Sequence, residues 1–359
     1  MRPTRLEVNL NRFYHNINEI KKYTHKEIMP VIKANAYGTY INQRLDVLNH
    51  FKIVAVALVS EGIELRNLGY EGDILVLNQP ANNEIEEIEK NHLTIGLSSM
   101  AFLKECIKKD VSFPIHLEIE TGMNRTGINL FDLGDFIEVI KRSKLPITGI
   151  YSHFSSADTD DNYSRQQINT FQRALEVCMQ KDIKFEYVHM SASNGLLLYD
   201  LPFTNIVRPG ILMYGYESYK GCSKDISIKP ICRLVSEITF IKTVPKGTKI
   251  GYNEQYTCEE ETIVATIPIG YGDGLRRSQS KNGYVYIKDQ KAKIIGNICM
   301  DSIMVDITDI PSTIGDEVII WDDKNITLEE IAEECDTIHY EILSTISHRI
   351  PRIFKEEKE

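Results

Sequence analysis

The sequence has no apolar run long enough to cross a membrane. Its longest aliphatic stretch, residues 53–59, is far shorter than the roughly 20 residues that span a bilayer. The first residues, MRPTRLEV, include no apolar stretch that could serve as a signal peptide. The seven cysteines are odd in number, scattered, and form no Cys-x-x-Cys pair, which argues against a disulfide framework or a zinc ribbon. We therefore expect a cytoplasmic protein with reduced thiols, no membrane partner and no metal site.

The sequence also lacks an excess of basic charge. Its 41 Lys and Arg residues against 51 Asp and Glu residues give a formal net charge of −10. Because nucleic acids and anionic membranes attract basic surfaces, neither is expected as the main partner. No Gly-x-Gly-x-x-Gly motif follows the first predicted strand, which argues against an open dinucleotide-binding sheet.

The first part of the chain alternates short apolar runs with amphipathic helical stretches. Continuous apolar runs of this kind are typical of strands in a parallel sheet covered by helices. Eight such units in about 220 residues predict a (β/α)₈ TIM-like barrel spanning residues 1–225. A helix is expected over residues 10–20 with Asn9 or Asn11 as its cap, and the first strand and helix are candidates for pairing with the C-terminal domain. The predicted barrel strands are residues 28–33, 53–58, 74–77, 93–97, 113–119, 147–153, 186–190 and 205–208.

The pattern changes near residue 225. Strand-like runs follow one another, separated by turn signals such as Pro245-Lys246-Gly247 and Asn282-Gly283. They predict a C-terminal, mostly β domain over residues 226–359, with two short helices near residues 328–334 and 340–346. The Lys- and Glu-rich tail after Phe354 is expected to be a frayed end. The predicted strands are residues 230–244, 263–267, 285–288, 292–298, 303–307 and 317–321.

Polar residues follow the predicted barrel strands. In a barrel, residues just past the carboxyl ends of the strands form the functional mouth. An amine that emerges from a buried apolar strand, as Lys33 does, has its ammonium form disfavoured, which lowers its pKa and suits Schiff-base chemistry. The residues expected to converge at this mouth are Lys33, Arg125, His153, Ser193 and Arg208.

Motifs along the whole chain resemble the alanine racemase family. The segment VIKANAYG at residues 31–38 is similar to the family's signature for the lysine that carries pyridoxal 5′-phosphate (PLP). Several motifs match, and the resemblance rests on their occurring in the family's order across both predicted domains. The other matching segments are TGMNRTG (121–127), SHF (152–154), VRPGI (207–211), GYN (251–253), IGYGDG (269–274), CMD (299–301) and SHRIPR (347–352).

The resemblance implies an amino-acid racemase with two bases. Lys33 would carry PLP covalently and act as the base on the face of the D-amino acid, while Tyr252 of a second subunit would act on the opposite face. Racemisation needs both, because one base removes the α-proton and the other delivers one. Arg208 would contact the pyridine nitrogen and keep it unprotonated, and His153 would link Arg208 to Tyr252. The resemblance thus implies a homodimer with shared active sites.

The resemblance also assigns residues to the cofactor and the substrate. The PLP phosphate would be held by Tyr37, Ser193, the backbone N–H groups of Gly210 and Ile211, and Tyr340. Glycine allows close backbone approach, and oriented N–H groups suit an anion. Arg125 and the backbone N–H of Met300 from the partner would hold the substrate carboxylate. Tyr271 would line the entrance to the pocket.

The sequence departs from the family pattern at three places. Thr39-Tyr40 stands where the family usually has His-Gly. The segment MSASN at residues 190–194 differs from the usual one, so that Ser191 or Asn194 is an alternative to Ser193 at the phosphate. Many relatives have a carbamylated lysine at the position of Glu118, which supplies an anion to the arginine that matches Arg125. Glu118 is already anionic, and we expect it to pair with Arg125 and orient it.

The expected function is therefore PLP-dependent interconversion of L-alanine and D-alanine, which supplies D-alanine for peptidoglycan. One alternative is a racemase of serine or of a basic amino acid, but Tyr340 matches a tyrosine that narrows the pocket for alanine. A second is a PLP-binding homeostasis protein without racemase activity, but such proteins lack the β domain. A third is a decarboxylase of the same architecture, which would place an acidic residue where Arg208 stands.

Overall fold

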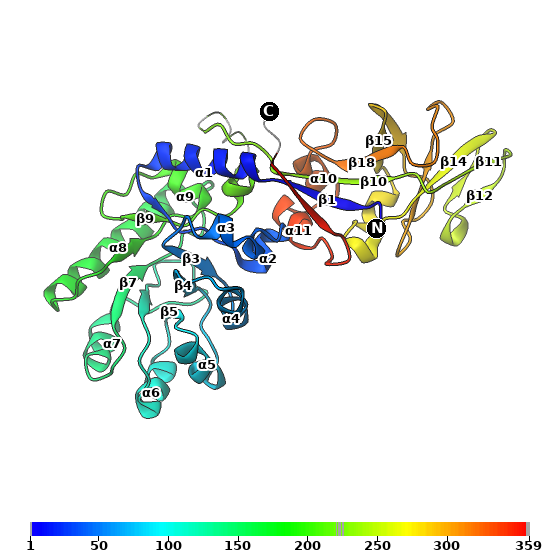
Figure 1. Ribbon diagram of the computed structural model, residues 1–359. Helices are drawn as coiled ribbons and strands as arrows, with labels where there is room; N and C mark the ends of the chain where they lie inside the picture. The colour runs from blue at the N-terminus through cyan, green and yellow to red at the C-terminus, as the bar shows by residue number, and fades with distance from the viewer. Residues whose placement is uncertain (1, 220, 222–223, 225, 357–359) are drawn as a thin grey trace.

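The computed structural model describes residues 2–219, 221, 224 and 226–356. Two parts lie side by side, a helix-covered barrel from the first part of the sequence and a mostly β part from the rest (Figure 1). The expected boundary between them, after residue 225, falls on a residue outside the described ones. Among the described helices, none combines the length and apolar character needed to cross a bilayer.

Eight parallel strands form the barrel. Six lie in one sheet in the order β3-β4-β5-β6-β7-β8, and β2 pairs with β9. Backbone hydrogen bonds close the ring on both sides: Ala55 N–H donates to Pro30 O at 2.8 Å, and Arg208 N–H donates to Ser191 O at 2.9 Å. The expected barrel fold is confirmed. The strands are β2 (Glu27–Ile28), β3 (Ile53–Val56), β4 (Asp73–Val76), β5 (Thr94–Leu97), β6 (Ile115–Glu118), β7 (Ile147–Tyr151), β8 (Tyr187–His189) and β9 (Ile206–Val207).

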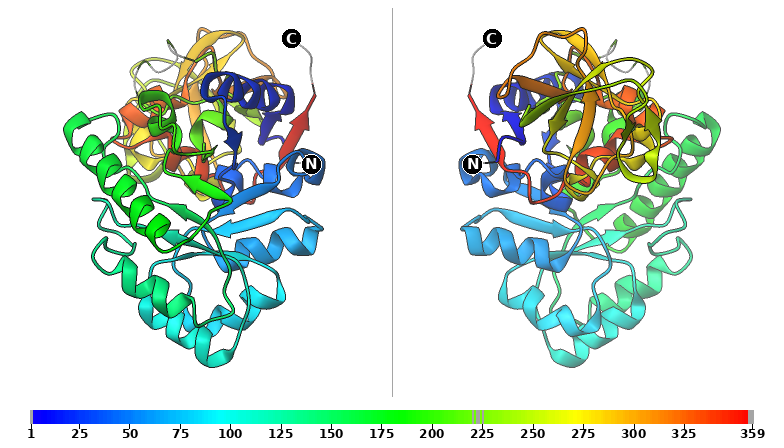
Figure 2. Two further views of the ribbon diagram at one scale, coloured as in Figure 1. Left: turned by 90° about the vertical axis from the view of Figure 1, so that its left-hand side faces the viewer. Right: turned by 90° about the vertical axis from the view of Figure 1, so that its right-hand side faces the viewer.

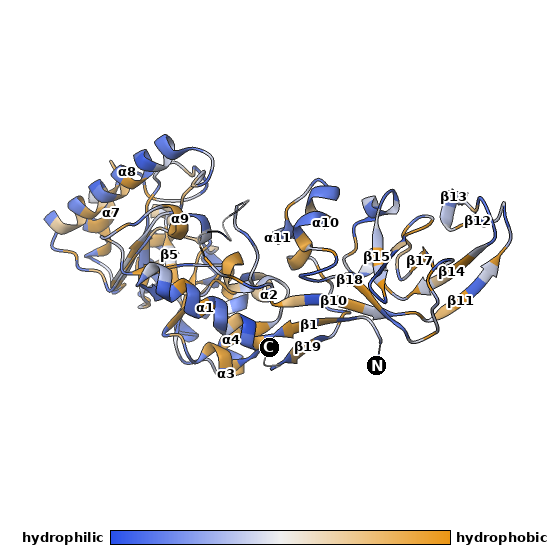
Figure 3. Ribbon diagram, turned by 90° about the horizontal axis from the view of Figure 1, so that it is seen from above, coloured by the Kyte–Doolittle hydropathy of each residue, from blue (hydrophilic) through white to orange (hydrophobic). Residues whose placement is uncertain are grey.

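Helices surround the barrel, as the two side views show (Figure 2). The helix α1 (Leu10–Thr24) begins after Asn9, whose side chain accepts a hydrogen bond from Arg12 N–H at 3.0 Å, so the cap is Asn9. Figure 3 shows hydrophobic and hydrophilic sides on α1, α7 and α8, as expected for helices that bury one face. The others are α2 (Lys33–Tyr37), α3 (Leu45–Leu48), α4 (Val59–Leu68), α5 (Ile85–Lys90), α6 (Met100–Lys109), α7 (Leu133–Ile140), α8 (Asp161–Gln180) and α9 (Ser193–Leu198).

Two glycines in the barrel strands make room for polar side chains. A Cβ on Gly96 in β5 would lie 2.2 Å from Tyr151 Oη, and a Cβ on Gly149 in β7 would lie 2.6 Å from the His116 ring. Side chains cannot approach so closely, which is why glycine occupies both positions. One side of the barrel interior therefore holds Tyr151, His116 and His189, all buried. The opposite side is aliphatic and includes Met29, Val31, Ile53, Ala55 and Leu75.

The C-terminal part is built from three small sheets. They have the strand orders β16-β15-β18-β10-β1-β19, β11-β14-β17 and β12-β13. The expected strand over residues 230–244 is two strands in different sheets. The elements are β10 (Cys232–Glu237), β11 (Phe240–Val244), β12 (Lys249–Ile250), β13 (Tyr256–Thr257), β14 (Thr262–Ile267), β15 (Tyr284–Ile287), β16 (Gln290–Lys293), β17 (Ile303–Asp306), β18 (Glu317–Trp321), β19 (Arg352–Lys355), α10 (Leu328–Glu334) and α11 (His339–Ser344).

Both ends of the chain enter the largest of these sheets. Strand β1 (Arg5–Asn9) pairs antiparallel with β10 and parallel with β19. The prediction of a frayed end after Phe354 is wrong for Lys355, which pairs with Asn9. The first strand thus belongs to the C-terminal sheet, and the helix that follows it packs on the barrel (Figure 1).

Candidate active site

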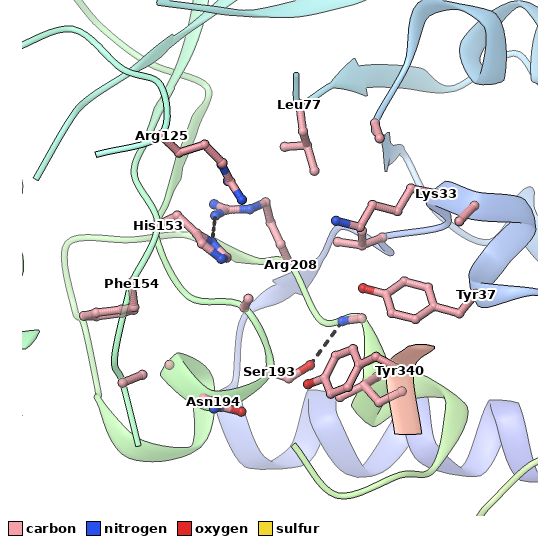
Figure 4. Close-up of a pocket in the computed structure, with 18 of the residues that line it drawn as sticks. Lys33, Tyr37, Leu77, Arg125, His153, Phe154, Ser193, Asn194, Arg208 and Tyr340 are labelled. Carbon is pink, nitrogen blue, oxygen red and sulfur yellow. Dashed lines mark hydrogen bonds between the residues drawn. The ribbon is translucent and has the colours of Figure 1, made fainter. Parts of the chain in front are cut away.

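A pocket of about 570 Å³ lies at the carboxyl ends of the barrel strands. All five residues expected at this mouth line it, and Tyr340 of α11 joins them from the C-terminal part of the chain (Figure 4). The side chains of Lys33, Arg125 and Arg208 point into the same space. Among the other residues expected at the site, Tyr37, Glu118, Gly210 and Ile211 also line this pocket.

Lys33 begins the short helix α2 rather than ending a strand. Strand β2 ends at Ile28, and the extended chain continues to Val31, which bridges to Ala55 of β3. Burial lowers the pKa of the Lys33 amine, the positive charge of Arg125 lowers it further, and Glu61 acts in the opposite direction. An amine that loses its proton readily is suited to Schiff-base chemistry and to proton transfer.

The turn after Lys33 has a left-handed backbone. Residues 34–37 have φ angles between 52° and 55°, a conformation that costs roughly 1–2 kcal/mol for each non-glycine residue. The side chain of Glu61 holds this turn against β3, because it accepts hydrogen bonds from Ala34 N–H at 2.6 Å and Ala57 N–H at 2.7 Å. No sequence motif pointed to Glu61, which supports the lysine from α4.

The departure at Thr39-Tyr40 has a structural counterpart. Tyr40 has a φ of 62°, in the left-handed region that glycine adopts most easily. Glycine is the residue that the resemblance leads one to expect at this position. The Arg352 guanidinium carbon lies 4.5 Å from the centre of the Tyr40 ring, an attractive contact that offsets part of the backbone cost. Thr39 is buried, and its hydroxyl donates to Ala36 O at 2.7 Å.

Arg208 is buried in a set of hydrogen-bond acceptors. Its Nη1 donates to His189 Nδ1 at 2.5 Å, and its Nη2 donates to Ser152 O at 2.8 Å and to His153 Nδ1 at 3.3 Å. Burial lowers the pKa of Arg208 to about 10, so it stays a cation at neutral pH. Its Nε has no acceptor among the described residues and remains available to a ligand.

His153 is neutral and has a defined tautomer. Burial lowers its pKa to about 3, and the positive charges of Arg208, Arg125 and Lys33 act in the same direction. Because Arg208 can only donate, His153 Nδ1 is the acceptor and its Nε2 carries the proton. The side chain therefore offers an Nε2–H donor at the pocket wall.

A cradle for an anion lies at the other end of the pocket. Gly210 N–H donates to Ser193 Oγ at 3.2 Å, and a Cβ on Gly210 would lie 2.4 Å from Tyr37 Oη. Burial raises the pKa of Tyr37 to about 12, so its phenol remains a donor. The 3₁₀ helix that begins at Ile211 leaves its first N–H groups free. Of the two alternatives to Ser193, Asn194 lines the pocket and Ser191 does not.

Glu118 does not make the expected contact. Its Oε1 accepts a hydrogen bond from the Thr126 hydroxyl at 2.8 Å, its Oε2 is buried without a hydrogen bond, and no ion pair joins it to Arg125 among the described residues. Arg125 is exposed, whereas Thr126 is half-buried and places its hydroxyl within hydrogen-bond distance of the carboxylate at the end of β6. Burial raises the pKa of Glu118.

Tyr252, Tyr271 and Met300 lie apart from this pocket. Their exposed fractions are 68%, 43% and 52%, and none of them lines it. Two hydrogen bonds hold their loops together: Tyr271 N–H donates to Cys299 O at 3.0 Å, and the Asn297 side-chain Nδ2 donates to Tyr252 O at 2.8 Å. These three residues form one exposed cluster on the C-terminal part, which we call the 252–300 cluster.

Sequence reasoning missed a buried layer beneath Arg208. His189 lies between Arg208 and His116, and the Tyr151 ring stacks on His189 at 5.0 Å between ring centres. Polar residues within apolar strands, next to strand glycines, are the sequence signal for a functional interior at this place, and they lie within the strands, not past their carboxyl ends.

Comparisons with known proteins assign the whole chain to one family. Two family models match it, "Alanine racemase, N-terminal domain" over residues 8–218 and "Alanine racemase, C-terminal domain" over residues 231–354. An alanine racemase of Clostridium novyi is 36% identical over 375 aligned positions, covering 99% of this chain and 96% of the relative. Alanine racemase 2 of Caldanaerobacter subterraneus is 34% identical, covering 99% and 95%.

Solved structures agree with this assignment. The alanine racemase of Clostridium difficile 630 superposes with a TM-score of 0.93 at 32% identity, covering 99% of this chain and 96% of that one. The alanine racemase of Bacillus anthracis with bound L-Ala-P has a TM-score of 0.92 at 31% identity and the same coverage. With family models over both parts and relatives of matching length, this chain belongs to the alanine racemase family.

Proposed function

We propose that this enzyme interconverts L-alanine and D-alanine with PLP held at Lys33, in a dimer whose two subunits share each active site. The observation that carries the proposal is one pocket that joins a lysine of lowered pKa, two arginines and an anion cradle. The family is PLP-dependent. D-Alanine made in this way would serve peptidoglycan synthesis.

The pocket fits PLP on two grounds. A Cβ on Gly210 would lie 2.4 Å from Tyr37 Oη, so glycine at this position lets the Tyr37 hydroxyl approach the Gly210 backbone. The Ser193 hydroxyl and the Ile211 N–H lie at the same place, and a phosphate there would accept hydrogen bonds from these groups. The pocket also gathers three cationic side chains, Lys33, Arg125 and Arg208. Among the described residues, none of the three forms an ion pair with a pocket carboxyl (Glu118, Asp158 or Glu341), so an anionic ligand would supply their counter-charge. Tyr340 would complete the phosphate site from α11.

The reaction requires a proton to leave one face of the α-carbon and another to arrive on the opposite face. When bound, PLP supplies an electron sink for the charge left at the α-carbon. Lys33 Nζ would hold the proton on one face, helped by the lowered pKa of its amine. Arg125 would hold the substrate carboxylate, together with the Met300 backbone N–H of the second subunit.

The second base needs an environment that stabilises its anion, since a tyrosine hydroxyl ordinarily titrates at a pH of about 10. His153 can provide it. Its Nδ1 accepts from Arg208, so its Nε2–H is left to donate to the phenolate oxygen of Tyr252 from the second subunit. Arg208 would hold the pyridine nitrogen of the cofactor, where a permanent cation disfavours protonation of that nitrogen and so limits side reactions that need a stronger electron sink.

The dimer is supported by the position of the 252–300 cluster. Tyr252, Tyr271 and Met300 are exposed on their own chain and lie outside its pocket. Large exposed aromatic and apolar side chains held on linked loops are typical of an interface. In the proposed dimer this cluster closes the pocket of the other subunit, Tyr271 lines the entrance, and water is excluded from the proton-transfer site.

The substrate is tested by a chiral assay. Purified enzyme, with and without added PLP, is incubated with each L-amino acid, and the enantiomers are separated by chiral chromatography. We expect L-alanine to approach an equal mixture of enantiomers in the presence of PLP. If serine or a basic amino acid racemised faster than alanine, that amino acid would be assigned as the substrate. If no D-amino acid formed at all, the proposal would be overturned.

Tyr340 is expected to set the preference for alanine. Tyr340→Asn should open a polar space beside the substrate side chain and raise the ratio of serine to alanine turnover tenfold or more, because a difference of one small group is worth about 1–3 kcal/mol. The measurement is kcat/KM for both amino acids. Tyr340→Phe keeps the ring and should leave the ratio unchanged while weakening PLP retention. An unchanged ratio in Tyr340→Asn would place the selectivity elsewhere.

The charge of Glu118 is expected to support substrate binding through Arg125. Glu118→Gln keeps an acceptor for Thr126 but removes the charge, so the KM for alanine should rise and kcat fall, each on the order of threefold to tenfold. Because burial raises the pKa of Glu118, the wild-type carboxyl becomes protonated as the pH falls through that raised value. The two enzymes should therefore differ most at alkaline pH and converge as the pH falls.

Steady-state kinetics across pH measure this convergence, and intact mass shows that residue 118 is unmodified. Glu138→Gln is the control, since it removes a surface carboxylate that pairs with Lys181, far from the pocket, and should leave both constants unaltered. Identical kinetics for Glu118→Gln and wild type at every pH would limit Glu118 to a structural role.

A further inference from the structure

A pair of buried histidines lies directly behind Arg208. His189 in β8 and His116 in β6 are both fully buried inside the barrel, and His189 Nε2 lies 2.9 Å from His116 Nδ1. On its other side, His189 Nδ1 lies 2.5 Å from Arg208 Nη1. The three side chains form a continuous chain that ends at His116.

The proton positions along this chain are determined by Arg208. A guanidinium can donate hydrogen bonds but cannot accept them, so His189 Nδ1 must be the acceptor. The proton of neutral His189 is then on Nε2 and is donated to His116 Nδ1. His116 in turn carries its own proton on Nε2, and that nitrogen is buried without a hydrogen-bond partner. The direction of every hydrogen bond in the chain follows.

Both histidines stay neutral at working pH. Burial lowers the pKa of His116 to about 3, and burial together with the charge of Arg208 lowers the pKa of His189 further below its usual range. A neutral acceptor fixes the guanidinium and leaves its positive charge unpaired, whereas a carboxylate would neutralise that charge. No carboxylate forms an ion pair with Arg208 among the described residues.

An unsatisfied buried N–H is costly, yet the fold retains it. The ring of His116 occupies the space that Gly149 leaves, and it lies 5.5 Å from the Tyr187 ring. An aliphatic residue would fill this space without an unpaired donor, as the aliphatic side chains do on the opposite side of the barrel. The feature that only a side chain with an acceptor provides is the hydrogen bond to His189.

We propose that His116 is a positioning residue that holds His189 in the tautomer able to accept from Arg208, and thereby fixes the guanidinium against the cofactor's pyridine nitrogen. The proposal rests on the proposed role of Arg208. Without the acceptor at His116, His189 is free to move its proton to Nδ1, where it opposes the Arg208 N–H. The guanidinium then loses its shortest contact and shifts in the pocket.

The test compares two variants of nearly equal size. In His116→Asn the side-chain Oδ1 can take the place of the ring Nδ1 as acceptor, whereas His116→Leu has no acceptor. In the full-length holoenzyme we expect His116→Leu to lower kcat for alanine at least tenfold and to release more pyruvate and pyridoxamine phosphate per racemisation event. His116→Asn should recover most of both properties. Equal behaviour of the two variants would overturn the proposal.

A second measurement does not depend on activity or on the cofactor. Two-bond ¹H–¹⁵N correlation spectra of ¹⁵N-histidine-labelled wild-type protein report which ring nitrogen carries each proton, and the chain has only nine histidines to assign. We expect His189 and His116 both to be protonated on Nε2 alone. A proton on Nδ1 of His189 would overturn the proposal even if racemase activity were established. If both histidines had the expected tautomers but the protein racemised no amino acid, the result would contradict the proposed function and not the inference about His116.

Discussion

Replacement of Lys33 by alanine is expected to abolish racemisation of alanine. The substitution removes the amine that would hold PLP and one of the two bases, so neither cofactor attachment nor proton transfer on that face survives. Chiral chromatography of the reaction measures the loss. Treatment of the wild-type holoenzyme with borohydride, followed by peptide mass analysis, should find the reduced cofactor on Lys33 and on no other lysine.

Lys26→Ala is the matched control. Lys26 is also partly buried, and burial lowers its pKa too, but its amine donates to Leu201 O and the Thr204 hydroxyl before β2, away from the pocket. This variant should keep the cofactor and the activity. Full activity in Lys33→Ala would refute the assignment of the active site, and partial rescue by a small external amine would support it.

The barrel was predictable from sequence because its strands are buried on both faces. Parallel strands such as residues 53–56 and 115–118 are apolar or carry a functional residue at nearly every position, so they appear as continuous runs between amphipathic helices. The functional residues at the mouth were predictable for the same reason, since polar side chains directly after such runs converge by geometry.

The remaining features depend on contacts that the local sequence does not encode. Strand β19 is short and charged, and it is a strand only because β1, more than 340 residues earlier in the chain, offers its edge. The hydrogen bond from Thr126 to Glu118 was not predictable, because it depends on the three-dimensional placement of the loop after β6. The His116–His189 pair was not found because the motifs of the family end at the pocket surface.

Tyr252→Phe is expected to keep PLP but lose turnover on the order of 10²–10⁴-fold, the range typical of a positioned acid–base group. The phenyl ring preserves the shape of the side chain and removes only the oxygen that would carry the proton. Tyr252 is exposed and does not line the pocket of its own chain, so in the proposed dimer its oxygen would act in the second subunit. Tyr256→Phe, a nearby half-buried tyrosine in β13, should remain active and serves as the control.

The shared site has a direct test by subunit mixing. Homodimers of Lys33→Ala and of Tyr252→Phe are each expected to have little or no activity, because every site lacks one base. In a mixed dimer the two defects fall in one site, and the other site receives Lys33 from one subunit and Tyr252 from its partner. When equal amounts of the two variants exchange at random, half of the dimers are mixed and each has one intact site, so activity should return to about a quarter of the wild-type value. If exchange is demonstrated by mass and no activity returns, both bases must come from one chain and the proposed dimer site is wrong.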